Sequence, residues 1–168
     1  MSRSPENILL HLSESEEQQV REIFAALALQ GFPLQNQTPH ISITFAPKLA
    51  DEVIHCATDL LPAVIPAQLK RVGTVVFGTK RKQTVAWLLE TSPQLEHAGR
   101  TISEVNTVGH GPRWIPHLTM GLRLPREIVP EYLRALDELG AECCREFTAI
   151  RAGYWKPGLQ ELTVLAQG

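Results

Sequence analysis

The chain has 168 residues, 43% of them hydrophobic, which is enough to bury a core as one domain or two small lobes. Its formal net charge of −2 argues against a general polyanion binder, because such proteins are strongly basic. We find no membrane-spanning run, no signal peptide pattern, and three cysteines (Cys56, Cys143 and Cys144) without disulfide or zinc spacing. We therefore expect a cytoplasmic, monomeric protein with no membrane partner.

The first half of the chain predicts the order strand, helix, strand, helix, strand. Residues 7–12 indicate a strand, and Ser13 with Glu16 three residues later is typical of the start of a helix, which should end near Gly31. A second strand begins at His40, where polar and apolar residues alternate. The remaining elements are a helix at 50–61, ended by Pro62, and a hairpin formed by residues 68–78 and 83–90.

The second half of the chain repeats this order. His117 lies 77 residues after His40, and the same offset carries the other elements onto strands at 84–90, 147–154 and 160–167 and helices at 92–109 and 126–140. We therefore predict one bilobal domain over residues 1–168, with an internal repeat of roughly 7–83 and 84–168. The expected fold is α+β, a pseudo-twofold duplication of β-α-β-α-β units. Two antiparallel sheets should flank a central cleft, with the helices on the outside.

Two strands carry a histidine and a hydroxyl residue two positions apart. In "TPHISITF" these residues are His40 and Ser42, and in "IPHLTMGL" they are His117 and Thr119. Residues i and i+2 of a strand point to the same face, so each pair shares one face while its apolar neighbours face the helices. A pseudo-twofold axis would bring both pairs to one central cleft.

Other interpretations of these strands stay open. A histidine–x–hydroxyl triplet carries little information alone, since His11 and Ser13 match it too. We expect His11 to be a strand-end histidine outside the cleft. Both motif histidines could be structural, or they could ligate a metal, but a third or fourth ligand is missing at any recognisable spacing. We expect neither a metal nor a cofactor.

Acid–base chemistry suits the paired motifs best. An imidazole titrates near neutral pH, so that one of the two histidines can be neutral while the other is protonated. The hydroxyls are short, neutral donors for a phosphoryl oxygen that gains charge in the transition state. The residues therefore favour the hydrolysis of a phosphodiester.

The paired motifs resemble those of the two-histidine (2H) phosphoesterases, in particular the LigT-like RNA 2′,3′-cyclic phosphodiesterases, also named 2′-5′ RNA ligases. "RVGTVVFGTKRKQTVAWLLE" is similar to that family's hairpin between the motifs, and "FTAIRAGYWKPGLQELTVLA" is similar to its last two strands. The resemblance implies an enzyme that opens 2′,3′-cyclic phosphates without a metal and leaves a 2′-phosphate. Some members of the family also join or cleave 2′-5′ linked RNA.

The resemblance also implies roles for individual residues. His40 and His117 would be the catalytic pair, with His40 as the general acid and His117 as the general base. Ser42 and Thr119 would bind the phosphate. A second hypothesis, from a different class, is a non-catalytic nucleotide- or RNA-binding module on the same fold, which a turnover assay on a cyclic nucleotide would distinguish.

The chain departs from the family pattern at two positions. Thr44 stands where the family often has an arginine, and the basic residue after the second motif is displaced to Arg123. Both RNA ends with a cyclic phosphate and small cyclic nucleotides therefore stay open as substrates. Aromatic residues could stack on a base, among them Trp114 and Phe45, although we favour the core for Phe45. The further residues expected to contact substrate are Lys80, Arg81, Lys82, Arg123, Tyr154, Trp155 and Lys156.

Overall fold

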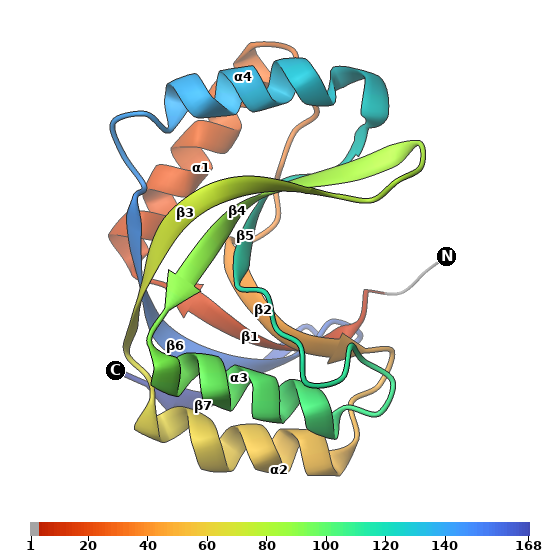
Figure 1. Cartoon of the computed structure of the whole chain (residues 1–168), viewed down its shortest axis with the longest axis vertical. Helices are drawn as coiled ribbons and strands as arrows, with labels where there is room; N and C mark the ends of the chain where they lie inside the picture. The colour runs from red at the N-terminus through yellow and green to blue at the C-terminus, as the bar shows by residue number, and fades with distance from the viewer. Residues whose placement is uncertain (1–3) are drawn as a thin grey trace.

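The computed structural model describes residues 4–168, which form four α-helices and seven strands (Figure 1). None of the helices in this part of the chain is long and apolar enough to cross a membrane. In chain order the elements are β1 (Glu6–Leu12), α1 (Glu14–Leu29), β2 (His40–Ala46), α2 (Asp51–Leu60), β3 (Ala67–Phe77), β4 (Lys82–Thr91), α3 (Pro93–Val105), β5 (His117–Pro125), α4 (Val129–Leu139), β6 (Glu146–Lys156) and β7 (Glu161–Gln167).

The predicted order of strands and helices is confirmed, with boundaries that differ by a few residues. The helix start at Ser13 is confirmed as well, because its hydroxyl accepts a hydrogen bond from the backbone N–H of Glu16 and donates one to the Glu16 carboxylate. The same carboxylate accepts from the backbone N–H of Thr148 on β6, at 2.7 Å for one oxygen. Ser13 thus caps α1, and Glu16 in the first turn fixes that helix to the sheet.

All seven strands belong to a single antiparallel sheet, so the prediction of two separate sheets needs correction. The strand order is β2-β1-β6-β3-β4-β5, and β7 pairs with β6 outside this path. The connection is made by β6, whose first residues pair with Ala67–Lys70 of β3 while its later residues pair with β7. A strand of 11 residues is long enough for two partners along one edge, and this pairing joins the two expected sheets into one.

The sheet is strongly curved, and the strands at the two ends of this path, β2 and β5, approach each other (Figure 1). The indole N–H of Trp114, just before β5, donates to the backbone oxygen of Ser42 on β2 at 2.9 Å. The helices lie outside the curve as two packed pairs, α1 with α4 and α2 with α3. Apolar side chains from the outward face of the strands, such as Ile41 and Leu118, are fully buried beneath them.

The helix pairs are formed across the two halves of the sequence. Both α1 and α2 come from the first half, yet each packs against a helix of the second half. The element order β-α-β-α-β occurs twice, and β2 and β5 begin at the two motif histidines. A duplicated, two-lobed domain stays our interpretation of this order.

Candidate active site

The first motif lies at the start of β2, where burial alternates along the strand. His40 and Ser42 are half-buried, whereas Ile41 and Ile43 between and after them are buried in the core. Pro39 precedes the strand, where its missing N–H costs no ladder hydrogen bond. The alternation therefore directs the imidazole and the hydroxyl to the concave side of the sheet.

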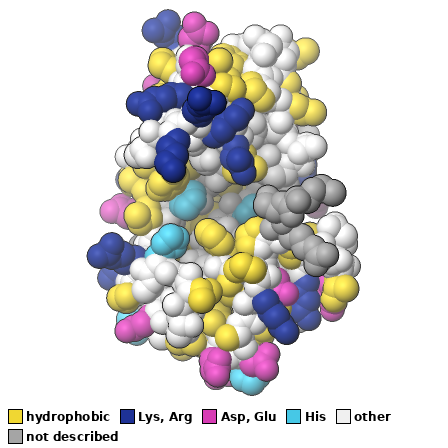
Figure 2. Space-filling model, turned by 90° about the vertical axis from the view of Figure 1, so that its right-hand side faces the viewer, with side chains coloured by type: hydrophobic (Ala, Val, Ile, Leu, Met, Phe, Trp, Pro, Cys, Tyr) yellow, Lys and Arg dark blue, Asp and Glu magenta, His cyan; other side chains and the backbone are white. Residues whose placement is uncertain are grey.

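The second motif repeats this arrangement at the start of β5. His117 and Thr119 are half-buried, and Leu118 and Met120 are completely buried. Because the curvature brings together β2 and β5, the strands at the two ends of the path, the motifs approach each other, and the charge of His117 acts on His40. Figure 2 shows histidine side chains close together in a recess of this face of the molecule.

The two imidazoles are held in the same way. The Nδ1 atom of His40 lies 2.7 Å from the backbone oxygen of Thr38, and that of His117 lies 2.7 Å from the backbone oxygen of Ile115. A carbonyl oxygen can only accept, so Nδ1 carries a proton in both rings and donates it. Each ring thereby keeps Nε2 for exchanging protons with a substrate.

Burial lowers the pKa values of both imidazoles, and the charge of His117 adds to this effect at His40. Burial is the largest cause at His40; the hydrogen bond to Thr38 raises the pKa, and the positive charge of His117 lowers it further. The pKa of His117 is also lowered by burial, against the raising effect of its hydrogen bond to Ile115. The electrostatic effect of one imidazole on the other indicates that protonation of one disfavours protonation of the other.

The expectation that His11 lies outside the site is wrong. His11 pairs directly with His40 across β1 and β2, and residues paired in this way project from the same face of the sheet. On its other side it pairs with Arg151 of β6. Ile8, Leu10 and Leu12 belong to the hydrophobic core, so His11 lies on the opposite face together with Leu9, which is also buried.

Asn7 is a further residue that the sequence did not reveal. Its side chain is 8% exposed, and its Nδ2 donates to the hydroxyl oxygen of Ser42 at 2.7 Å. With its oxygen accepting from Asn7, the Ser42 hydroxyl can still donate its own proton to an oxygen of a ligand. Nothing in the local pattern around Asn7 predicts this contact, which depends on the register between β1 and β2.

The basic turn between β3 and β4 lies beside the end of β5. The side chains of Lys80, Arg81 and Lys82 are exposed. Arg126, which sequence analysis missed, donates its backbone N–H to the oxygen of Arg81 and its guanidinium to that of Thr79. The basic cluster is defined here as Lys80, Arg81, Lys82, Arg123 and Arg126. Figure 2 shows Lys and Arg side chains gathered above the histidines on one face of the molecule.

The predicted aromatic contacts fall into different surroundings. The side chain of Tyr154 is 6% exposed and its hydroxyl donates to Glu6 at 2.5 Å, so its ring is not available to stack on a base. Trp155 is half-buried and pairs with Asn7, which places it on the same face as the motifs. The Nζ atom of Lys156 lies 5.0 Å from the centre of the Tyr154 ring.

For two other aromatic residues, exposure is the opposite of what the sequence predicted. Phe45, expected in the core, is 46% exposed, because a register shift in the β1–β2 ladder pairs it with Asn7. Trp114, considered for stacking, is 8% exposed and holds β2 through Ser42. A glycine allows this packing, since a Cβ on Gly99 would lie 2.1 Å from the Trp114 ring.

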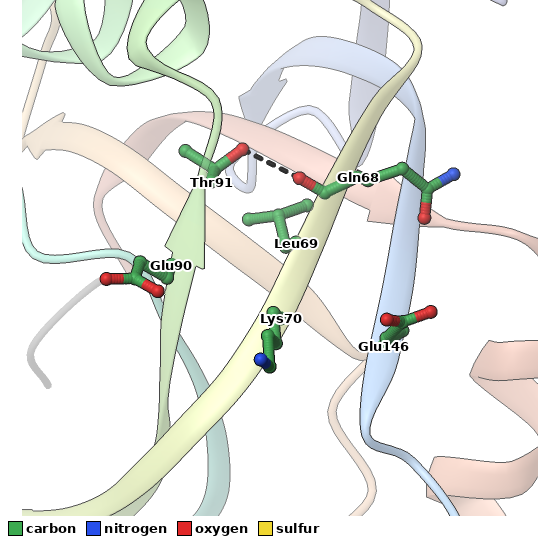
Figure 3. A pocket seen from close by; sticks show the side chains of 6 residues that line it. All are labelled: Gln68, Leu69, Lys70, Glu90, Thr91 and Glu146. Atoms are coloured by element: carbon green, nitrogen blue, oxygen red, sulfur yellow. Dashed lines mark hydrogen bonds between the residues drawn. The ribbon is translucent and has the colours of Figure 1, made fainter.

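A separate groove lies at the other end of β3 and β4 (Figure 3). Lys70, Glu90 and Glu146 carry its charges, and a hydrogen bond of 2.8 Å joins the hydroxyl of Thr91 to the backbone oxygen of Gln68. Neither motif histidine lines it. In residues 4–168, no three His, Cys, Asp or Glu side chains come together in a group that could hold a metal ion.

Comparison with known proteins identifies the fold and no sequence family. No family model and no curated protein matches the sequence. The fold resembles that of Usb1 from Kluyveromyces marxianus in a structure with uridine monophosphate, with a TM-score of 0.53 and 14% identity over 96% of this chain and 97% of that chain. A second structure of Kluyveromyces marxianus Usb1 gives the same TM-score and identity over 98% of both chains. At this identity the likeness concerns the fold alone.

Proposed function

We propose that the protein is a metal-independent phosphodiesterase that hydrolyses 2′,3′-cyclic phosphates to 2′-phosphates. The observation that carries the proposal is the matched pair of imidazoles, each holding its Nδ1 proton on a backbone oxygen and leaving Nε2 for chemistry. The repulsion between the two rings disfavours protonation of both at once, and the negative charge of a bound phosphate favours protonation of one. General acid–base catalysis of phosphodiester hydrolysis needs this combination of one base and one acid.

The proposed reaction moves two protons between substrate and imidazoles. The neutral imidazole removes a proton from water as the water oxygen attacks phosphorus. The bond from phosphorus to the ribose 3′ oxygen breaks, and the imidazolium gives its proton to that oxygen. The product is a nucleoside 2′-phosphate with a free 3′ hydroxyl, and the two histidines have exchanged their protonation states.

The roles of the two histidines stay a prediction. The family resemblance implies His40 as the acid and His117 as the base. In the free protein, burial and the charge of His117 lower the pKa of His40. These surroundings disfavour the protonated form that His40 needs as the acid. A bound phosphate counteracts this effect, since its negative charge favours the imidazolium form.

Ser42 and Thr119 are the proposed donors to the phosphoryl oxygens. Each lies two residues after a motif histidine and on the same face. Asn7 supports Ser42 by donating to its oxygen, which leaves the hydroxyl proton for the phosphate. In the transition state, where negative charge increases on the phosphoryl oxygens, such donors stabilise the complex most.

We propose RNA ends or small nucleotides with a cyclic phosphate as substrates. The uridine monophosphate in one Usb1 structure supports a nucleotide ligand for this fold. The basic cluster and Trp155 supply positive charge and an aromatic ring for a nucleic acid near the motifs. Joining RNA through a 2′-5′ linkage would be the same displacement at the same site, with the 5′ hydroxyl of a second RNA attacking phosphorus in place of water.

The direct test is turnover of uridine 2′,3′-cyclic phosphate, followed by separation of the 2′- and 3′-phosphate products. We expect uridine 2′-phosphate to form, at the same rate with and without excess EDTA. Binding of the nucleotide without turnover would instead support the non-catalytic module. Loss of activity in EDTA and its recovery with zinc or manganese would contradict a metal-independent reaction.

A further inference from the structure

We infer that His11 and Arg151 form a subsite for a second phosphate of the substrate, beside the phosphate that reacts between His40 and His117. The inference rests on the proposed function, because it assumes that the reacting phosphate lies at the two motifs. It deepens that function by naming the class of substrate: one that carries another phosphate next to its cyclic phosphate. The two sources of such a phosphate are the phosphodiester of an RNA chain and the 5′-phosphate of a mononucleotide.

The three residues involved form a row across neighbouring strands. Arg151 on β6 pairs with His11 on β1, and His11 pairs with His40 on β2. Directly paired residues of an antiparallel sheet project from the same face, about 5 Å apart. The row therefore leads from the reacting phosphate at His40 to a guanidinium two strands away.

The guanidinium of Arg151 has N–H donors that lack a hydrogen-bond acceptor in the protein. Its Nε atom is buried and has no hydrogen-bond partner, and its Nη2 atom makes one long contact of 3.4 Å with Nδ1 of His11. No carboxylate of residues 4–168 forms an ion pair with Arg151. Leaving a buried donor of a charged group unpaired costs free energy, and an anion bound by the other N–H donors of the same guanidinium would offset that cost. Guanidinium groups bind phosphate oxygens well because two parallel N–H donors match them.

His11 contributes a donor of its own. A guanidinium only donates, so Nδ1 of His11 accepts from Arg151 and the ring proton is on Nε2. Burial, then the charge of Arg151, then that of His40 lower the pKa of His11 to about 4. At neutral pH His11 is therefore a neutral donor, which separates it from the histidines that exchange protons.

The other half of the site has no such row. His117 pairs with Leu88 on β4, and Leu88 pairs with Gly73 on β3. Neither position offers a side-chain donor. The second phosphate is therefore bound on the His40 side only, and this gives the bound substrate a fixed direction.

The test compares three substrates: uridine 2′,3′-cyclic phosphate, its 5′-phosphorylated form, and the dinucleotide UpU ending in a 2′,3′-cyclic phosphate. We expect kcat/KM to be higher for the two substrates with a second phosphate. Arg151→Gln should reduce that preference roughly 10–100-fold, and His11→Leu should reduce it by less. Arg151→Lys should keep part of it, since a point charge replaces a two-donor fork. Arg100→Gln, on the exposed face of α3, is the matched control and should keep the preference.

The outcomes separate the possibilities. A preference for the 5′-phosphorylated form alone identifies a nucleotide monoester, and a preference for the dinucleotide alone identifies an RNA phosphodiester. Absence of any preference in the wild type, or an equal loss on all three substrates in folded Arg151→Gln, would overturn the subsite. If no substrate turns over, the proposed function fails, but the subsite can still be tested by binding. Calorimetry then compares the affinity of uridine 2′-phosphate with that of uridine 2′,5′-bisphosphate, which carries the second phosphate. Equal affinities would refute the subsite.

Discussion

Around His40 the neighbouring strand positions carry polar side chains, whereas around His117 they carry apolar ones. His40 has His11 as its cross-strand neighbour, and Ser42 accepts a hydrogen bond from Asn7. His117 has Leu88 as its cross-strand neighbour, and its ring lies 4.8 Å from that of Phe77. The motifs are thus nearly identical while their surroundings differ.

This difference suggests a division between chemistry and recognition. Proton transfer needs two equivalent groups, and the two motifs supply equivalent imidazoles and hydroxyls. Recognition of a chain with a direction needs an asymmetric site, and the polar and apolar surroundings supply that asymmetry. Variants in each half therefore measure how far the two halves are alike.

Removing either motif histidine should have the largest effect. We expect His40→Ala and His117→Ala each to lower kcat about 10²–10⁴-fold, because each removes one of the two groups that transfer protons. Binding of uridine 2′-phosphate should weaken far less. The control is His97→Ala on the exposed face of α3, which should keep wild-type kcat. Equal nucleotide affinity and equal kcat in all three variants would show that the motifs are not the active site.

The two hydroxyl residues should contribute less than the histidines. Ser42→Ala and Thr119→Ala should each lower kcat about 10–10³-fold, since each removes one neutral donor to the phosphoryl oxygens. Steady-state kinetics on uridine 2′,3′-cyclic phosphate measures both. Ser42→Thr and Thr119→Ser keep a hydroxyl and should recover much of the activity, and a failure of both to do so would argue against a donor role.

Asn7 should act only through Ser42. We expect Asn7→Ala to lower kcat by less than Ser42→Ala does, and the double variant to be no slower than Ser42→Ala, because the amide has no role once the hydroxyl is absent. Full additivity of the two losses would indicate that Asn7 has a separate function. No comparable hydrogen bond to Thr119 exists in residues 4–168, so the coupling should be confined to the His40 half.

His11 should affect stability in acid more than at neutral pH. Its pKa is about 4 in the folded protein and near 6.5 when unfolded, so the unfolded chain binds more protons as the pH falls between these values. This contribution to the free energy of unfolding is complete above pH 6.5 and is lost as the pH falls toward 4. His11→Leu should therefore lose less stability over this range in urea unfolding. Parallel losses in wild type and variant would contradict the assignment.

The sequence predicted the elements and the two motifs because both depend on local patterns. The alternation around His40 and His117 and the constant offset between them were sufficient to place these residues on matching strands. The face of His11 could not be predicted in this way, because the apolar run Ile8–Leu10 that precedes it shows no alternation and four successive residues of β1 are buried.

The remaining features depend on pairing between distant strands. The single sheet follows from four paired positions of β3 and β6, far apart in the chain, which no local pattern encodes. The contact of Asn7 with Ser42 and the exposure of Phe45 depend on a register shift between β1 and β2. Tyr154 was predicted from its residue type, but alternation along β6 places its ring on the buried face.

The pH dependence of kcat/KM and kcat for wild type and both single-histidine variants tests the paired mechanism most directly. The wild type should give bell-shaped profiles, because one imidazole must be neutral and the other protonated. The ordinary pKa of an imidazole is about 6.5, and a bound phosphate raises it because it favours the charged form. The structure adds burial, which lowers both pKa values, so the acidic limb of kcat/KM should lie below that value.

The basic limb should move to higher pH in kcat, where the bound phosphate stabilises the imidazolium. Each alanine variant should lose one limb of the bell, and the limb lost would also assign acid and base to His40 and His117. A wild-type profile without a bell, or a histidine variant that keeps both limbs and near-wild-type kcat, would contradict the paired mechanism.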